Sequence, residues 1–331
     1  MGEFGLIKLL ADIIDKNKNL NHASWQQLIV GIGDDTAAWQ GDDSIQLATT
    51  DCLIQDTHFA LNITPWEELG WKAVAVNLSD IAAMGGIPKY ILVSLALPGE
   101  IEVDCVSSLY RGMTRIADQF EVAIAGGNVA SSDKVMITIT IIGISKDKTM
   151  LTRSAARPGD IIAITGYTGL SAAGLMMLKQ EIKCDTEATR LFREAHLKPI
   201  PRIPEGQILL YCGATAAIDI SDGLIADLSH ICESSHVSAR ISSDLIPIHP
   251  TLQRYFKNDC LTLALTGGED YELLFTANDK NMEYIKKSIS CPVTIIGEII
   301  REEPEHVIIT GTNKQIPSWQ QGGWNHFKSQ I

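Results

Sequence analysis

The sequence predicts a two-domain α/β protein with mixed sheets. The chain has 331 residues, a length that suits two domains better than one. Apolar strand-like runs and helix-like segments alternate in both halves, and Pro158-Gly159 marks a break between them. The composition, with 45% hydrophobic and 20% charged residues, is that of an ordinary globular protein. We expect an N-terminal domain over residues 1–148 and a C-terminal domain over residues 149–331.

The elements of the first half follow from apolar periodicity and from the residues that interrupt it. Leucines and isoleucines between Leu6 and Ile14 have helical spacing and predict an amphipathic surface helix. The later segments are an apolar run over 27–32 before Gly33-Asp34-Asp35, a strand over 44–48 ended by Thr49-Thr50-Asp51, a helix over 65–84, a strand over 90–97, a helix over 103–119, and strands over 122–125 and 135–144 beside a Gly126-Gly127 loop.

The second half begins with a linker and then repeats the α/β alternation. We expect the linker over 153–159, strands over 161–165, 215–220, 271–275 and 293–296, and helices over 171–181, 222–233 and 279–288.

Charge and cysteine content exclude several classes of protein. Lys and Arg number 27 against 40 Asp and Glu, and the net charge of −13 disfavours both nucleic acid and anionic membrane surfaces as partners. No apolar run approaches the roughly 18 residues of a membrane-spanning helix. The 7 cysteines contain no C-x-x-C pair, which disfavours a zinc site and indicates reduced thiols. We expect a cytoplasmic protein.

Carboxylates gather where predicted strands end and predicted helices begin. Each one alone has a structural explanation, such as a helix N-cap for Asp222 or Ser221, or a turn residue for Asp34. If they converged they would repel one another, so convergence would require cations, and oxygen donors favour Mg²⁺ or Mn²⁺ over Zn²⁺. The residues are Asp34, Asp35, Asp51, Asp80, Asp219, Asp222, Glu269 and Asp270.

Mg²⁺ bound by several carboxylates suggests a nucleotide phosphate as ligand. The sequence nevertheless lacks a Walker A motif, the protein-kinase motifs, a complete dinucleotide fingerprint and a G-x-S-x-G nucleophile elbow. Any nucleotide chemistry must therefore use another architecture.

At this point the chain resembles the thiamine-monophosphate kinase family, in motif order and over nearly its whole length. The motifs are GIGDDTA (31–37), TTD (49–51) followed by His58 and Phe59, WKAVAVNLSDIAAMGG (71–86), AGGN (125–128), LTRSAARPGD (151–160), AIDISDGL (217–224), LTGGEDYELLFT (265–276) and GWNHF (323–327). The resemblance implies the two-domain fold of the aminoimidazole-ribonucleotide synthetase and selenophosphate synthetase superfamily. It also implies a homodimer in which the N-terminal sheets form a barrel.

The resemblance also assigns roles to individual residues, with metal, ATP and dimer contacts in the N-terminal domain and nucleotide and substrate contacts in the C-terminal one. The implied ligands of several Mg²⁺ ions are Asp34, Thr49, Thr50, Asp51, Asp80, Asn128, Asp219 and Asp222. The implied ATP contacts are Tyr110, Gly127, Asn128, Arg153 and Ser221, and the implied thiamine monophosphate contacts are His58, Glu269 and Trp324.

The chemistry of these residue types suits the implied ligands. A thiazolium cation favours an aromatic face such as Trp324 and a carboxylate such as Glu269, and Arg153 can contact phosphate through two N–H groups. Each position also has a structural alternative: Trp324 as a packing anchor, His58 as a satisfied histidine and Tyr110 as a core residue.

One position departs from the family pattern. Asn128 stands where the family usually has Asp after the Gly-Gly pair, so a carbonyl oxygen is kept and a negative charge is lost. Val129 removes a hydroxyl group at the next position. The other ligand positions are intact, which favours a working enzyme.

The implied reaction transfers a phosphoryl group from ATP to thiamine monophosphate and yields ADP and thiamine diphosphate, the last step of thiamine diphosphate biosynthesis. The acceptor is a phosphate oxygen that is already anionic near neutral pH, so alignment and charge neutralisation replace a general base. Asp51 and Asp222 are the positions expected to be most sensitive in catalysis.

Two alternatives remain open. The first is another ATP-dependent enzyme of the superfamily with a different acceptor. Selenophosphate synthetase would need a reactive cysteine or selenocysteine that this chain does not offer. The second is a non-catalytic protein that binds nucleotide or thiamine and has lost activity with Asn128.

Overall fold

The chain forms two compact units. The computed structural model describes residues 3–30, 38–39, 41, 44–145 and 149–311. One unit comprises Met1–Ile81 with Gly86–Thr149, and the other comprises Ala82–Gly85 with Met150–Ile331. Each unit has its own sheet, and the roles predicted for the two halves stay predictions. Among the helices of the described residues, none has the length and apolar character needed to cross a membrane.

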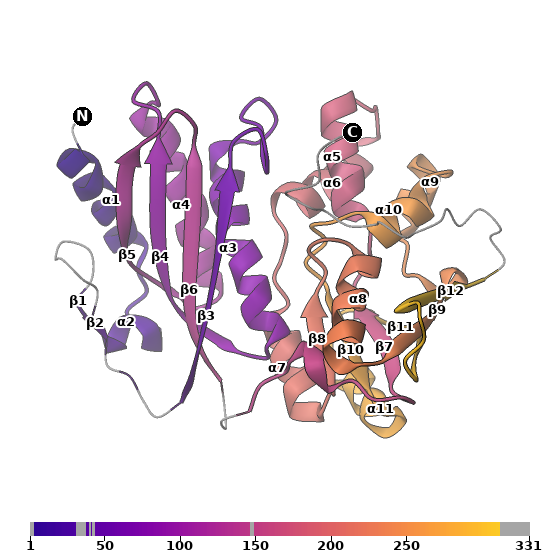
Figure 1. Cartoon of the computed structure of the whole chain (residues 1–331). Coiled ribbons are helices and arrows are strands. Elements are labelled where there is room, and N and C mark those ends of the chain that lie inside the picture. Colours follow the sequence, from indigo (N-terminus) through magenta and orange to yellow (C-terminus); the bar gives the residue numbers. More distant parts are fainter. Residues whose placement is uncertain (1–2, 31–37, 40, 42–43, 146–148, 312–331) are drawn as a thin grey trace. The chain divides into compact units, whose positions relative to one another are not determined.

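The first unit is a four-stranded mixed sheet with two long helices, α3 and α4, along one face (Figure 1). The strand order is β3-β6-β4-β5, in which only β4 and β5 are parallel. A two-stranded ribbon, β1 with β2, precedes it. The elements are α1 (Glu3–Asn17), α2 (Ala23–Gln27), β1 (Leu28–Val30), β2 (Ala38–Trp39), β3 (Ile45–Ile54), α3 (Trp66–Ala83), β4 (Ile87–Leu97), α4 (Val103–Gln119), β5 (Ala123–Ser131) and β6 (Met136–Ser145).

Side-chain alternation in β6 separates the two faces of this sheet. Ile137, Ile139 and Ile141 are at most 1% exposed, whereas Thr138 and Thr140 between them are half-buried. This period of two is that of a strand with only one face in a hydrophobic core. The register places Asp51 opposite Ile139, on the buried face, while Cys52 lies opposite Thr138 on the other.

The second unit is built on a six-stranded sheet of order β12-β9-β11-β7-β10-β8, antiparallel except between β12 and β9. Its strands are β7 (Ile161–Thr165), β8 (Ala216–Asp219), β9 (Ser238–Ser242), β10 (Leu273–Ala277), β11 (Val293–Ile300) and β12 (Val307–Thr310). Its helices are α5 (Leu170–Gln180), α6 (Thr186–Leu197), α7 (Ile203–Cys212), α8 (Leu224–Ser235), α9 (Pro250–Tyr255), α10 (Cys260–Thr266) and α11 (Asp279–Ser288), with 3₁₀ turns η2 (Arg153–Ala155) and η3 (Ser243–Leu245).

Two hydrophobic clusters support this second unit. The larger joins α8 to the sheet, with Leu228 and Ile231 of the helix against Ile218 and Ile241 of the strands. The smaller joins α5, α6 and α9 around Phe192, which packs edge-on against Phe256 with 5.5 Å between ring centroids. The larger cluster includes residues of β8 and α8, the elements that carry Asp219 and Asp227.

Several predicted elements are confirmed, and others differ for identifiable reasons. The helices 103–119 and 279–288 and the strand 161–165 have the predicted bounds. Two predicted strand ends are wrong. Thr49-Thr50-Asp51, expected to end a strand, lies inside β3, and Gly126-Gly127, expected to form a loop, lies inside β5. Both are edge strands of the four-stranded sheet, where polar residues and glycines are tolerated. The linker 153–159 contains a 3₁₀ turn, and α6 and α7 lie in a stretch for which no element was predicted.

We predict that Gly112→Ala destabilises the first unit, because α3 and α4 cross in contact there. A Cβ at Gly112 would lie 1.9 Å from the Glu67 carbonyl oxygen, and one at Gly70 would lie 1.9 Å from that of Leu109. Alanine gains about 1 kcal/mol in helix propensity, but forcing the helices apart should outweigh it and leave a net loss of about 2 kcal/mol in the free energy of unfolding.

Urea denaturation of the two proteins measures this difference. Gly99→Ala is the matched control, since a Cβ there meets no atom within 4 Å, and it should change stability little. An alanine at position 112 that raised stability would contradict the close crossing.

Candidate functional site

The first unit brings two carboxylates together beside a threonine. Thr49 and Asp51 lie on the same face of β3, two residues apart, and Asp80 approaches from α3. The Thr49 hydroxyl donates to Asp80 Oδ2 at 2.5 Å. Three of the residues assigned to metal by resemblance are therefore neighbours, from segments about 30 residues apart in sequence.

The electrostatics of this group favour a cation. Although Asp51 reaches solvent, burial of its carboxyl group and, secondarily, the nearby Asp80 carboxylate raise its pKa to about 6. Two like charges held close are relieved by a bound cation, and hydroxyl and carboxylate oxygens are the donors that Mg²⁺ prefers. The residues present thus fit the predicted metal.

Two other predicted ligands lie apart from this group within the unit. Thr50 is on the opposite face of β3, where its hydroxyl donates to the Ile139 carbonyl and accepts from Thr140. Asn128 is on β5, at the other edge of the sheet, three strand spacings or about 14 Å from β3. Across the four strands, Asn128 is aligned with Ser94, Thr138 and Cys52, and not with Asp51. Their metal roles stay predictions.

Gly127, assigned to ATP, has a structural reason to be glycine. A Cβ there would lie 1.9 Å from the Val93 carbonyl oxygen of the neighbouring strand. Tyr110, also assigned to ATP, is 4% exposed in α4, and burial raises the pKa of its hydroxyl. The Nδ1 atom of His58, assigned to substrate, accepts the Ile54 N–H at 2.9 Å and closes the turn after β3. The ligand roles of all three stay predictions.

In the second unit, two acidic segments are bound to each other through their backbones. Residues 219–223 begin with the last residue of β8, and residues 267–272 precede β10. Three backbone hydrogen bonds join them: Ile220 N–H to Glu272 O, Tyr271 N–H to Ile220 O and Glu269 N–H to Ser221 O, at 2.8–2.9 Å. The pairing brings the segment of Asp219, Ser221 and Asp222 beside that of Glu269, and their ligand roles stay predictions.

Close approach explains the glycines of the second segment. A Cβ on Gly268 would lie 2.6 Å from the Ser221 carbonyl oxygen, and one on Gly267 would lie 2.4 Å from that of Leu263. Beyond them, Glu269 and Tyr271 have positive φ angles of 66° and 51°. Left-handed backbone at two non-glycine residues is strained, and surrounding contacts must hold it in place.

Asp227 is a residue that the sequence reasoning missed. One of its carboxylate oxygens, Oδ2, accepts the backbone N–H groups of Ser221, Asp222 and Gly223 at 3.0–3.1 Å. The N-cap of α8 is Gly223, so the N-cap explanation considered for Asp222 and Ser221 is wrong. The available signal was a lone acidic residue on the otherwise apolar face of a predicted helix, between Leu224 and Leu228.

Negative charge is concentrated around Asp227. Burial, then the neighbouring Asp219 and Asp222 carboxylates, raise its pKa to about 8 against the lowering effect of the N–H donors. Oxygens of Asp222 and Asp227 and a ring nitrogen of His230 lie within 4.8 Å of one another. Asp219 itself is 2% exposed. As in the first unit, crowded oxygen donors fit a divalent cation.

The remaining predicted residues are dispersed or outside the described part. Arg153 is exposed in η2. Its backbone carbonyl accepts a hydrogen bond from the hydroxyl of Ser235, at the C-terminal end of α8. The Asp222 group is at the other end of that helix, roughly 18 Å away along its axis. Asp34 and Trp324 lie outside the described residues. Asp270, in contrast, caps α5, accepting the N–H groups of Gly169 at 2.6 Å and Ser171 at 3.1 Å.

Comparison with known proteins identifies both halves of the chain. Residues 33–145 match the family described as AIR synthase related protein, N-terminal domain, and residues 157–310 match its C-terminal domain. The thiamine-monophosphate kinase of Bacillus subtilis is 37% identical over 336 residues, covering 99% of this chain and 100% of that protein. The chain belongs to the thiamine-monophosphate kinase family.

Other members of the thiamine-monophosphate kinase family agree in sequence and in structure. The Escherichia coli enzyme is 35% identical over 98% of each chain. The crystal structure of thiamine-monophosphate kinase from Stenotrophomonas maltophilia superposes with a TM-score of 0.82 at 33% identity, covering 91% of this chain and 95% of that one. A structure of AaThiL complexed with AMPPCP and TMP has a TM-score of 0.76 at 33% identity, covering 98% and 97%. The predicted family and two-domain fold are thereby confirmed.

We predict that Asp227→Ala loosens the 221–223 turn and lowers stability by about 2–3 kcal/mol, because three N–H groups, one buried and two partly buried, lose their acceptor. Asp227→Asn keeps an acceptor oxygen at the same place and should lose less. Thermal unfolding measures both.

Glu233→Gln is the control on the same helix, because the Glu233 side chain is 57% exposed and its neutralisation should change stability little. Equal stability of Asp227→Ala and wild type would show that the three hydrogen bonds do not hold the turn.

Proposed function

We propose that this chain phosphorylates thiamine monophosphate to thiamine diphosphate at the expense of ATP. The observation that carries the proposal is the near-complete match to thiamine-monophosphate kinases, one of whose solved structures is a complex with AMPPCP and TMP. The carboxylate groups at Asp51–Asp80 and at Asp219–Asp222 stand at the family's motif positions and support phosphate chemistry. The chain is accordingly a phosphotransferase whose acceptor is a phosphate group.

The same proposal assigns Mg²⁺ ions to these two groups of carboxylates. In the first unit the ligands would be Asp51 and Asp80, with Thr49 beside them, and in the second Asp219 and Asp222. Bound Mg²⁺ supplies charge neutralisation for phosphate groups that otherwise repel each other. Asp34, Thr50 and Asn128 complete the proposed ligand set by resemblance.

The chain's own residues bind and orient the two substrates in this proposal. The residues proposed to contact ATP are Tyr110, Gly127, Asn128, Arg153 and Ser221. His58, Glu269 and Trp324 contact thiamine monophosphate, whose cationic ring pairs with the Glu269 carboxylate. Since the acceptor phosphate is already anionic, alignment in line with the leaving group replaces proton abstraction.

We also propose a homodimer formed through the sheet of the first unit. The face of this sheet opposite α3 and α4 carries Thr50, Ser94 and Thr140 among half-buried apolar residues such as Leu92 and Met136. The exposed Thr50 and Ser94 on this face of mixed polarity support packing against another sheet.

We predict that Asp51→Asn and Asp222→Asn each lower turnover by at least about a hundredfold while leaving the fold intact, because each removes a ligand charge without changing side-chain volume. The assay mixes each protein with ATP, MgCl₂ and thiamine monophosphate and separates the thiamine esters by chromatography. Circular dichroism and ATP binding serve as folding controls.

Formation of thiamine diphosphate by the wild type, and not by Asp51→Asn, is the expected result, and it would also show that Asn128 permits catalysis. Absence of product from a folded wild-type protein that binds ATP would refute the proposed reaction. Asn128→Asp would then separate a different acceptor from a binding-only protein, since restored activity would trace the loss to position 128. A variant at position 51 or 222 with wild-type turnover would remove that residue from the mechanism.

A further inference from the structure

Arg202 fixes one end of the acidic segment 267–272 from a distant part of the chain. Its Nε donates to Glu272 Oε2 at 2.7 Å and its Nη2 donates to Glu272 Oε1 at 2.5 Å. The Thr165 hydroxyl donates to the same Oε2 at 2.7 Å and accepts the Leu273 N–H at 2.8 Å. Glu272 is 8% exposed, so this two-pronged pair is shielded from solvent.

His196 contacts the other part of the segment. Its Nδ1 lies 3.5 Å from Glu269 Oε2 and 3.1 Å from the Ser171 hydroxyl. The imidazole is almost fully buried, whereas the Glu269 side chain is 30% exposed. A buried ring behind a carboxylate that reaches solvent is placed to orient that carboxylate outward, and a proton on Nδ1 can be shared with it.

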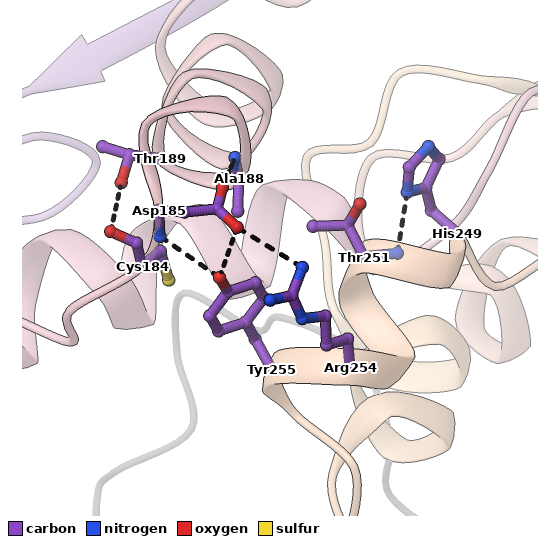
Figure 2. Close-up of polar contacts among 8 residues, drawn as sticks. All are labelled: Cys184, Asp185, Ala188, Thr189, His249, Thr251, Arg254 and Tyr255. Carbon is purple, nitrogen blue, oxygen red and sulfur yellow. Dashed lines mark hydrogen bonds and ion pairs between the residues drawn. The ribbon is translucent and has the colours of Figure 1, made fainter.

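The helix that carries His196 is itself held at its far end. At the start of α6, Asp185 accepts the Ala188 N–H at 2.8 Å and the Tyr255 hydroxyl at 2.7 Å, and Arg254 lies 3.4 Å away (Figure 2). These contacts, the first above all, hold the pKa of Asp185 below its usual value. With Phe192 buried in the same helix, α6 is a rigid support for His196.

The segment needs such support because its backbone is strained. Glu269 and Tyr271 both adopt left-handed φ angles, and Asp270 between them is bound to the start of α5. Ser171 of α5 also contacts His196, so the contacts of Glu269 and Asp270 are joined, while Glu272 is held by Arg202 and Thr165.

We propose that His196 and Arg202 are positioning residues for the thiamine-phosphate site: they hold Glu269 in the geometry that binds the substrate cation. The proposal rests on the proposed function and names two residues that contact neither ATP nor the reacting phosphates. They act through Glu269 and Glu272, and their removal selectively weakens binding of thiamine monophosphate.

The test compares steady-state constants of His196→Ala, His196→Asn and Arg202→Lys with the wild type. For His196→Ala, KM for thiamine monophosphate should rise about tenfold, because Glu269 loses the contact that orients it, while kcat and KM for ATP stay within about twofold. His196→Asn places an N–H near the former Nδ1 and should recover much of the affinity. Arg202→Lys keeps the charge but loses the two-pronged contact, and should also raise KM for thiamine monophosphate.

A double-mutant cycle separates positioning from general damage. If His196 acts through Glu269, then His196→Ala adds little to the defect of Glu269→Gln. Hydrogen exchange of the 267–272 amides is the readout besides activity, and it should accelerate in His196→Ala and Arg202→Lys. Arg190→Gln is the matched control on α6, because Arg190 is 68% exposed and pairs with Glu194 along the helix surface.

Additive defects in the cycle, or equal increases in both KM values, would overturn the proposal. Unchanged amide exchange with unchanged KM would do so too. If His196→Ala does not fold, the KM values and amide exchange of His196→Asn and Arg202→Lys test the proposal instead. A wild-type protein that makes no thiamine diphosphate would refute the proposed function and this inference together. An active wild type with unaffected variants would refute the inference alone.

Discussion

Repulsion between crowded carboxylates is the constraint around which both units are organised. In the second unit, the protein itself offsets much of the charge: backbone N–H groups converge on Asp227 and Asp270, and Arg202 pairs with Glu272. In the first unit, the Asp51 carboxyl keeps a raised pKa beside Asp80. Within the second unit, Asp227, which accepts three N–H groups, therefore lies beside the Asp219 and Asp222 carboxylates, and this crowding of negative charge favours a cation.

The sequence predicted the family, the fold class and the long regular elements because those depend on local pattern. The helix 103–119 has apolar residues at helical spacing, and the strand 161–165 is a short apolar run. Thr49-Thr50-Asp51 was misjudged since polar residues usually end a strand, but β3 is an edge strand and continues to Ile54. Pairing with β6 over the whole of β3 outweighs the low strand propensity of Asp51.

The sequence named candidate residues but not their arrangement. Motif positions gave Asp51, Asp80, Asp219 and Asp222 as metal ligands, and these roles stay predictions. The structure places Asp51 near Asp80, and Asp219 and Asp222 near Asp227, but no sequence pattern separates ligands from the residues that hold them. Asp227 binds three N–H groups only four to six residues away, yet in sequence it is one acidic residue on a helix. Arg202 and Glu272 are 70 residues apart, so their pairing is fixed by how α7 and β10 pack.

These supporting contacts explain how a strained segment can serve as a binding surface. Each left-handed non-glycine residue costs about 1–2 kcal/mol, so a free segment would relax and spread Glu269 over many orientations. Contacts at Gly268, Asp270 and Glu272 remove that freedom before the substrate arrives. A segment that is already ordered in the unliganded protein loses little conformational entropy on binding. The attraction between a carboxylate and a cationic ring is then not reduced by that entropy cost. If Glu269 binds the substrate as proposed, the residues that hold its segment contribute to affinity without contacting the substrate.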